Sequence, residues 1–347
     1  MNLSIIIPIK IEFGKDVIDF VKYIHHLSDQ MTHYEYEIII SNESNDEVFN
    51  YISNEMKNHT KVKHIMPNPS YRTGANDKLN GIYAALEYCK YEKILLVDDH
   101  YRVSKSTLEQ LIPFYEIYDC FKMMPKFDKF PASALLDLCG MYIINILDPK
   151  KQYCGHLCFK KTHIMKFGFP SRDSLFDELA IETHLKKNKC STGYIKNVAL
   201  EAVQNISTKR FWEQRIRYAY ENMALPIRFV IFLSILPILT SLLIISPLLA
   251  ICFAIFLSVA VILLAFIGQM IYGKKNVPHF SFLLSPIWFW FYPFTSWMAI
   301  VKYFSGGVMF GGRKIQKALV KSKREKVKDK SLFHSELIDN DRESILK

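Results

Sequence analysis

The chain has 347 residues, half of them hydrophobic, and this length allows one large domain or two of ordinary size. Its seven cysteines show no Cys-x-x-Cys pair and no disulfide-scaffold spacing, which excludes a disulfide-rich secreted module and favours reduced thiols in a cytosolic protein. The formal net charge of +10 could indicate nucleic acid, but much of the excess lies beside apolar C-terminal segments. Attraction to anionic lipid explains it more simply, so we expect no nucleic-acid partner.

Short apolar runs alternate with polar stretches up to about residue 225. In chain order we expect strands over residues 3–8, 36–40, 62–66 and 93–97, and helices over residues 15–27 and 78–89. This alternation predicts an α/β fold in which crossover helices connect the strands of a parallel sheet. Ligands of such sheets bind beyond the carboxyl ends of the strands, where three polar clusters of this chain occur.

The first feature with a clear chemical meaning follows the strand over residues 93–97. Asp98 and His100 stand at i and i+2, so both can face a divalent ion that also binds a diphosphate. The imidazole favours manganese over magnesium, because it is a softer ligand than a carboxylate. The alternative is that Asp98 or Asp99 caps the following turn and His100 points to solvent, which is the commoner arrangement for such a tripeptide.

A second acidic cluster contains Asp177 and Glu178 at the expected start of a helix. A carboxylate here could remove the proton from a sugar or lipid hydroxyl. Acidic residues are also common at helix N-termini, where they interact favourably with the macrodipole. Both interpretations stay open on the residues alone.

A third feature covers residues 211–218. Helical spacing puts Gln214, Arg217 and Tyr218 on one face, where the arginine could bind a diphosphate and the ring could contact a sugar or acceptor. Alternatively, this amphipathic face rests on lipid, since the apolar segments begin directly after it.

Residues 227–272 contain a single charged side chain, Arg228, and are long enough for two membrane crossings with a turn at Ser246 and Pro247. A third apolar segment, residues 282–304, is rich in aromatic residues and broken by prolines, so it crosses, re-enters or lies at the interface. The basic residues from 313 onward favour the cytosolic side. We therefore expect an even number of crossings in a multi-pass protein of an inner or plasma membrane, with the head and tail cytosolic.

These clusters, in this order, resemble the family 2 glycosyltransferases of the GT-A fold, and most closely their ceramide-glucosyltransferase-like members. The motifs that carry the resemblance are residues 74–80 (similar to Gly-x-Asn-Pro-Lys-x-Asn), 98–103 (Asp-x-Asp-x-Arg-Val), 155–161 (Gly-x-x-x-x-Arg-Arg), 214–218 (Gln-x-x-Arg-Trp) and 310–313 (Trp-Arg-Gly-Arg). Asp177 and Glu178 stand where the family has its catalytic carboxylate.

The resemblance implies a GT-A, Rossmann-like mixed sheet followed by a helical membrane region. It also implies an inverting transfer of a sugar from a UDP-sugar to a lipid or lipid-linked acceptor in glycolipid biosynthesis, with Mn²⁺ or Mg²⁺ at the diphosphate. The implied roles are metal binding by Asp98 and His100, catalysis by Glu178 or Asp177, and contacts to the nucleotide sugar or acceptor by Ser41, Asn42, Asp46, Gly74, Lys78, Asn80, Asp99, Gln214, Arg217 and Tyr218. The chain departs from the family pattern at Ser41-Asn42 (often Asp), His100 (Asp), Glu178 (Asp) and Tyr218 (Trp).

We expect the following organisation: a catalytic domain over residues 1–208, an interfacial helix over 209–226, two membrane helices over 227–272, a third segment over 282–304, and a basic, partly disordered tail over 313–347. The short membrane region favours a single transfer to a lipid over a processive polysaccharide synthase. A non-catalytic membrane protein that only binds a nucleotide is the alternative from another class. The sequence leaves the sugar, the acceptor and the oligomeric state open.

Overall fold

The computed structural model describes residues 2–127, 129–148, 155–203, 208–273, 277–320 and 324–325. The chain divides into two compact units. The first consists of Met1–Lys122, Gly155–Gly193 and Val320–Lys347, and the second of Met123–Cys154 and Tyr194–Leu319. These boundaries differ from the expected domains, because residues 123–154 group with the apolar C-terminal helices.

The first unit contains the sheet. Its strands are β1 (Leu3–Ile9), β2 (Tyr36–Asn42), β3 (Val62–Ile65), β4 (Lys93–Val97), β5 (Tyr101–Arg102), β7 (His156–Lys160), β8 (Phe169–Pro170), β12 (Arg324–Glu325) and the beginnings of β6 (Cys120–Phe127) and β9 (Thr192–Ala202). Its helices are α1 (Lys15–Gln30), α2 (Asp46–Met56), η1 (Pro69–Tyr71), α3 (Asp77–Leu86), α4 (Lys105–Leu111), α5 (Phe114–Ile117), α7 (Lys161–Phe167) and α8 (Asp177–Lys187). The expected strands and helices all lie within one to three residues of observed ones.

The strand order in this unit is β3-β2-β1-β4-β7-β6. The first four strands run parallel, whereas β7 is antiparallel to both β4 and β6, so the predicted α/β fold with a mixed sheet is confirmed. Strands β1 and β2 are buried along their whole length, as their continuous apolar runs predict. Apolar side chains of α3, including Leu79 and Ile82, pack against Ile6 of β1 and Leu96 of β4. This packing fixes the start of α3 at the carboxyl edge of the parallel strands.

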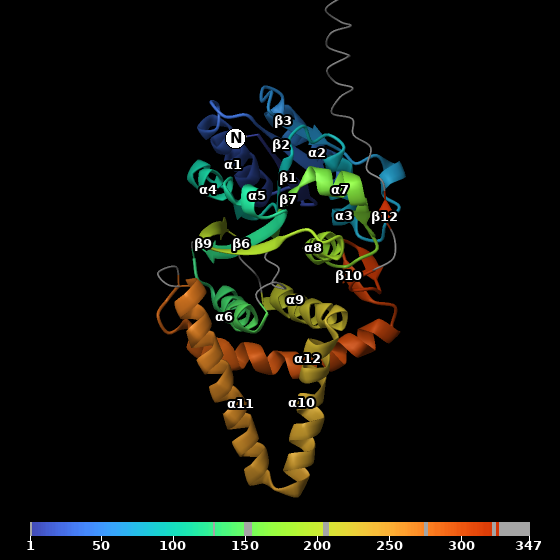
Figure 1. Cartoon of the computed structure of the whole chain (residues 1–347). Helices are drawn as coiled ribbons and strands as arrows, with labels where there is room; N and C mark the ends of the chain where they lie inside the picture. The colour runs from blue at the N-terminus through green and yellow to red at the C-terminus, as the bar shows by residue number, and fades with distance from the viewer. Residues whose placement is uncertain are drawn as a thin grey trace, which may run out of the picture. The chain divides into compact units, whose positions relative to one another are not determined.

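The second unit is mostly helical (Figure 1). Its elements are α6 (Ala132–Leu147), α9 (Thr208–Glu221), η3 (Asn222–Ala224), α10 (Pro226–Ile245), α11 (Pro247–Gly268), η4 (Gln269–Gly273), η6 (Ser281–Leu284), α12 (Ser285–Phe304), β10 (Val308–Phe310) and β11 (Arg313–Ile315), together with the remainder of β6 and β9. The sequence analysis did not predict α6. Figure 1 shows α12 lying across the open end of the α10–α11 hairpin, and both hairpin helices contact it.

Helices α10 and α11 form the predicted hairpin. The turn is where it was expected, since α10 ends at Ile245 and α11 begins with Pro247, a residue that suits the first turn of a helix. Both helices are long and apolar enough to cross a membrane, yet only 11% and 17% of their most apolar windows are buried. A core helix of a soluble protein would cover such side chains.

The expected basic tail falls partly outside the described residues, which leave out residues 321–323 and 326–347. Before that, residues 313–315 form β11, and the backbone N–H of Val320 donates to Ser174 Oγ at 3.0 Å.

Candidate active site

Three carboxylates and one lysine meet at the carboxyl edge of the parallel strands in the first unit. Ligand oxygens of Asp98, Asp177 and Glu178 all lie within 4.8 Å of one another. Lys78 Nζ lies 2.6 Å from Asp98 Oδ1, 2.7 Å from Asp177 Oδ2 and 3.4 Å from Glu178 Oε1. The Lys78 side chain is 17% exposed, so these charges interact in a largely desolvated environment. We call these four residues the carboxylate cluster.

Lys78 reaches this position because Asn76 ties the start of α3 to the segment before α8. The Asn76 side chain caps α3 by accepting from the N–H of Leu79 at 3.3 Å, and its amide donates to the carbonyls of Ser174 and Leu175 at 2.9 and 3.0 Å. Asn76 is fully buried. One side chain therefore fixes α3 relative to the first turn of α8, where Asp177 and Glu178 stand.

Further hydrogen bonds join the start of α3 to the segment before α8, and they involve Gly74, Asn80 and Arg172. Asn80 Nδ2 donates to the Gly74 carbonyl at 2.9 Å and its Oδ1 accepts from the Gly74 N–H at 3.1 Å. Arg172 Nη1 donates to the same Oδ1 at 3.2 Å. A Cβ on Gly74 would stand 2.3 Å from Arg172 Cβ, so only glycine fits. The resemblance assigned Gly74 and Asn80 to the nucleotide sugar, but in the structure these polar groups form hydrogen bonds within the fold.

Asp98 is held by the loop that follows β4. Its backbone N–H donates to the carbonyl of Gly155 at 3.0 Å, and its carbonyl accepts from the N–H of Tyr101 at 3.1 Å. Gly155 has a φ of 71°, and a Cβ there would lie 3.0 Å from Asp98 Oδ2 and 2.9 Å from the Tyr101 ring. A glycine is required at this position for the chain to approach the Asp98 carboxylate.

The electrostatics of the carboxylate cluster differentiate its members. Burial and the neighbouring Glu178 raise the pKa of Asp177 well above its ordinary value, despite Lys78. Burial also raises the pKa of Asp98, against the opposing effect of Lys78. Burial alone would raise the pKa of Glu178 too, but Lys78 and hydrogen bonds outweigh it and the pKa is lowered. The ammonium of Lys78 keeps its proton, because the three carboxylates outweigh its desolvation and raise its pKa. Of the three carboxyl groups, Asp177 therefore retains a proton most readily.

The predicted metal pair of Asp98 and His100 is only partly matched by the geometry. His100 Nδ1 lies 3.3 Å from Asp99 Oδ1, and the ring packs near Tyr101. Among the described residues, the ligand atoms that gather around Asp98 belong to Asp177 and Glu178. The sequence analysis assigned these two carboxylates to catalysis alone, because nothing in the spacing of residues 98 and 177 indicates that they meet.

The residues expected at the nucleobase and ribose follow β2. Ser41 and Asn42 are its last two residues and both are buried. Asn42 Oδ1 accepts from the N–H of Ser44 at 2.8 Å, and its amide lies 3.1 Å from His64 Nε2. Asp46 lies in the exposed first turn of α2. These residues are at the same carboxyl edge as Asp98, since β1 joins β2 and β4 in parallel.

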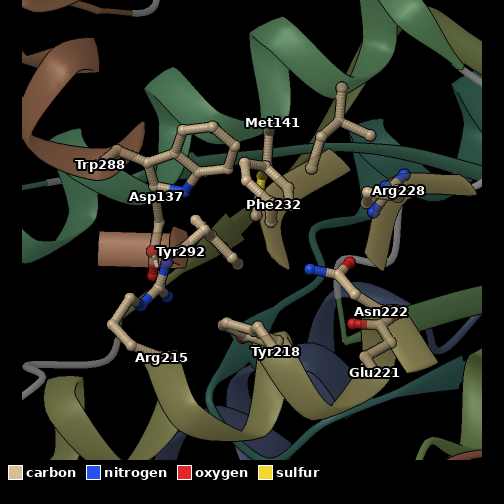
Figure 2. A pocket seen from close by; sticks show the side chains of 12 residues that line it. Asp137, Met141, Arg215, Tyr218, Glu221, Asn222, Arg228, Phe232, Trp288 and Tyr292 are labelled. Carbon is tan, nitrogen blue, oxygen red and sulfur yellow. Dashed lines mark ion pairs between the residues drawn. The ribbon is translucent and has the colours of Figure 1, made fainter. Parts of the chain in front are cut away.

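Gln214, Arg217 and Tyr218 lie on α9 in the second unit. The guanidinium of Arg217 stacks 4.6 Å from the centroid of Phe310, and burial raises the pKa of Tyr218. The sequence analysis assigned no role to Arg215, which follows Gln214 in the same helix. This arginine is almost fully buried between the rings of Phe211 and Tyr218 and forms an ion pair with Asp137 of α6, beside a pocket of the second unit (Figure 2).

The carboxylate cluster has a donor set that suits a divalent cation. Hard oxygen ligands such as carboxylates are those that Mg²⁺ and Mn²⁺ prefer, and three of them lie close enough to share one ion. The ammonium of Lys78 stands among the same oxygens, so an ion that binds all three must compete with it.

Part of this site lies in a segment that matches a protein-family model. Residues 28–116, which include Lys78 and Asp98, match the model of Glycosyl transferase family 21. The predicted resemblance to glycosyltransferases is confirmed. The match ends before Asp177. A comparison with curated proteins gave no match.

Solved structures with a related arrangement are distant. The chain is similar to TarS of S. aureus, residues 1–349, at 16% identity and a TM-score of 0.42, over 63% of this chain and 64% of that one. It is similar to glucosyl-3-phosphoglycerate synthase from Mycobacterium tuberculosis, solved with Mn²⁺, uridine diphosphate and glucosyl-3-phosphoglycerate, at 11% identity and a TM-score of 0.43, over 60% and 74% of the two chains. It is also similar to mannosyl-3-phosphoglycerate synthase from Rubrobacter xylanophilus, at 16% identity and a TM-score of 0.43, over 61% of this chain and 70% of that one. Likenesses this distant do not transfer a substrate.

Proposed function

We propose that this chain is a membrane-anchored, inverting glycosyltransferase that moves a sugar from a UDP-sugar to a lipid or lipid-linked acceptor. The observation that carries the proposal is the carboxylate cluster at the carboxyl edge of the parallel strands. Two of its members, Lys78 and Asp98, lie in the segment that matches family 21. Packing alone does not explain these charges, because burying charge is unfavourable and apolar side chains would fill the same space at a lower cost in free energy.

Asp98 and Glu178 would hold a divalent cation, which when bound would neutralise charge on the departing diphosphate. His100 stays a predicted ligand beside Asp98. Lys78 supplies positive charge at the same place and keeps its proton, so it can stabilise anionic oxygens of the donor. Gln214, Arg217 and Tyr218 of the second unit stay predicted contacts of the diphosphate and acceptor.

Asp177 is the catalytic base in this proposal, with Glu178 the ionised carboxylate beside it. A base works best when its pKa is near the working pH, and the pKa of Asp177 is raised in that direction. Asp177 accepts the proton of the acceptor hydroxyl while that oxygen bonds to the anomeric carbon and the bond to UDP breaks. The product is an inverted glycoside, UDP leaves with the bonding electron pair, and the proton stays on Asp177.

The membrane part of the proposal depends on α10 and α11. Their exposed apolar surfaces have the length needed for two crossings of a bilayer. Such a hairpin returns the chain to the side on which it started, which agrees with a cytosolic head and a basic cytosolic tail. The position of α12 across the open end of the hairpin favours an interfacial segment over a third crossing (Figure 1).

The deciding experiment incubates the detergent-solubilised full chain with a panel of UDP-sugars and a total lipid extract, and follows UDP release and new glycolipids by mass spectrometry. We expect one sugar to give a new lipid product, and Asp177→Asn to abolish it. Glu47→Gln, a change of an exposed carboxylate in the first turn of α2, is the control and should leave the rate unchanged. UDP binding without turnover on any lipid would favour a non-catalytic binding protein, and a polymeric product would favour a processive synthase.

A further inference from the structure

A second group of metal-ligating side chains lies at the other edge of the sheet from the carboxylate cluster. Ligand atoms of Asp119, His163 and Cys190 all lie within 4.8 Å of one another. Asp119 directly precedes β6, and the paired ends of β6 and β7 lie beside the start of β4, whereas Asp98 follows the end of β4. The length of β4, about 16 Å of extended chain, therefore separates the two groups.

The end of α8 determines where Cys190 lies. The N–H of Cys190 donates to the carbonyl of Leu185 and the N–H of Lys189 to that of Lys186, both at 3.1 Å, which is the pair of hydrogen bonds of a Schellman motif. Lys189 has a φ of 64°, the left-handed conformation that this motif requires. Cys190 is held in the hydrophobic cluster that contains Leu185 and is 8% exposed. Packing explains an apolar side chain at this position, but it does not explain why the thiol lies beside an imidazole and a carboxylate.

Hydrogen bonds orient the Asp119 carboxylate toward His163. Its Oδ2 accepts from the N–H and the hydroxyl of Ser191 at 2.9 and 3.0 Å. Its Oδ1 lies 3.0 Å from His163 Nε2 and 3.0 Å from Lys160 Nζ. One oxygen is therefore fixed by the residue that follows Cys190, and the other faces the imidazole. Burial alone would raise the pKa of Asp119, but these hydrogen bonds outweigh it and lower the pKa, so the carboxylate is ionised at neutral pH.

This set of ligands differs in kind from the carboxylate cluster. One sulfur, one imidazole nitrogen and one carboxylate oxygen suit Zn²⁺, whereas Mg²⁺ prefers oxygen alone. In a tetrahedral zinc site the nitrogen and oxygen ligands stand about 3.3 Å apart, and a thiolate sulfur about 3.6 Å from either. The 3.0 Å between His163 Nε2 and Asp119 Oδ1 is close to the first distance. The Cys190 sulfur lies within 4.8 Å of both atoms, so it has to approach them by no more than about 1.2 Å.

The group is open to an incoming ion. The side chains of Asp119 and His163 are 24% and 25% exposed, so one side of the group faces solvent. Lys160 is the only described cation in an ion pair with Asp119 besides His163, and a metal at Asp119 Oδ1 has to displace its ammonium. The Lys160 side chain is 26% exposed, and ion pairs of this kind are weak. The lysine can therefore turn into solvent when an ion binds.

We propose that Asp119, His163 and Cys190 bind a zinc ion, with water as the fourth ligand. Zinc binds Asp119 Oδ1, His163 Nε2 and Cys190 Sγ, the proton of the thiol passes to solvent, and the ammonium of Lys160 leaves the carboxylate. The ion joins three segments that are distant in the chain, namely the residue before β6, helix α7 and the link from α8 to β9. It stabilises the first unit at an edge that the carboxylate cluster does not reach, and its binding is independent of the proposed function.

Cobalt substitution tests the ligand set, because Co²⁺ occupies zinc sites and a thiolate ligand gives it an intense charge-transfer band in the near ultraviolet. The full chain, purified in detergent without an affinity tag, is titrated with Co²⁺ in a thiol-free reducing buffer that contains excess Mg²⁺. We expect an equimolar amount of Co²⁺ to produce the band and Zn²⁺ to remove it. Absence of the band would overturn the proposal, since Cys190 would then not be a ligand.

Three variants locate the ion. Cys190→Ser should abolish the charge-transfer band, and His163→Gln should weaken zinc binding at least about tenfold, the loss that changes around a metal ligand already cause. Lys160→Met should instead tighten zinc binding about threefold, because the competing ammonium is gone. A chain that failed to fold would not bind zinc more tightly, so this variant keeps the test independent of stability. Cys252→Ser, at an exposed cysteine of α11, is the matched control and should leave the band unchanged.

An unchanged band in Cys190→Ser would refute the site, as would unchanged zinc affinity in both His163→Gln and Lys160→Met. Thermal unfolding gives a second measurement: Zn²⁺ should raise the Tm of the unchanged protein more than that of Cys190→Ser, and an equal rise in both would count against the proposal. Asp177→Asn should leave the band intact, because the two groups share no residue. Zinc bound at Cys190 in a protein that transfers no sugar would support this site and refute the glycosyltransferase, and sugar transfer by a protein without the band would do the reverse.

Discussion

Replacing Lys78 with methionine removes the cation that lies among Asp98, Asp177 and Glu178 while keeping a side chain of similar length. Leaving one partner of a buried ion pair alone costs about 3–5 kcal/mol. We take the lower end, about 3 kcal/mol at pH 7, because the Asp98 side chain is 20% exposed and water can reach it. At roughly 2–4 °C per kcal/mol for a domain of this size, Tm should fall by about 6–12 °C.

The pH dependence of this loss has a definite sign. The folded-state pKa values of Asp98 and Asp177 are raised, so these two carboxyl groups bind more protons in the folded chain than in the unfolded chain once the pH exceeds their ordinary pKa. Their contribution to stability therefore falls as the pH rises through that range. Without Lys78 the repulsion between the carboxylates is stronger, so the Lys78→Met deficit should be larger at pH 7 than at pH 5.

Thermal unfolding in detergent, with and without Mn²⁺, provides the assay. A ligand at one hundred times its Kd stabilises the folded chain by about 2.7 kcal/mol, and Mn²⁺ should raise the Tm of Lys78→Met more than that of the unchanged protein, because the lysine no longer competes for the oxygens. Lys93→Met is the control, since its partner Glu116 is 76% exposed and such surface pairs contribute about 0–1 kcal/mol. A Tm equal to that of the unchanged protein, or an equal effect of Mn²⁺ on both, would show that Lys78 does not hold the carboxylates.

Further predictions concern other described features. Asp177→Asn should lower kcat about 10²–10⁴-fold and remove the acidic limb of the pH profile, in which activity rises as Asp177 loses its proton; a profile that keeps this limb would identify another base. Gly155→Ala, at a φ of 71° and with its added Cβ 3.0 Å from Asp98 Oδ2, should destabilise the chain by about 1–3 kcal/mol and lower UDP-sugar turnover, measured by thermal unfolding and UDP release. Lys122→Met should cost about 3–5 kcal/mol, because Glu182, 2.6 Å away, is left buried and charged; adding Glu182→Leu should restore most of the lost Tm. A tag after Lys347 should be accessible to cytosolic protease, and its protection would contradict an even number of crossings.

Much of the first unit could be predicted from its sequence, because its strands are buried on both faces. A continuous apolar run such as residues 36–40 has few other stable arrangements, and β2 begins at the residue expected. The hairpin could be predicted equally well, because forty-odd residues with a single charge leave few alternatives to membrane helices. In both cases the signal is local in the chain.

The candidate site was harder to predict, because its contacts are long-range. Asn76 helps to bring Lys78 and Asp177 together by donating to the carbonyls of Ser174 and Leu175, and no local pattern encodes that pairing. Helix α6 was missed for a similar reason. Its apolar residues face α11 and α12, so its run lacks the polar face that marks a surface helix.

Because Asn76 connects two segments that are distant in the chain, the carboxylate cluster can assemble only after both segments have been synthesised. Lys78 and Glu178 are 100 positions apart. At a translation rate of roughly 5–20 residues per second, Lys78 emerges about 5–20 seconds before its last partner. Until α8 is made, the nascent chain carries Lys78 and Asp98 without either of the other carboxylates. The segment that matches family 21 ends at residue 116, so a fragment of that length would have the family's signature and an incomplete site.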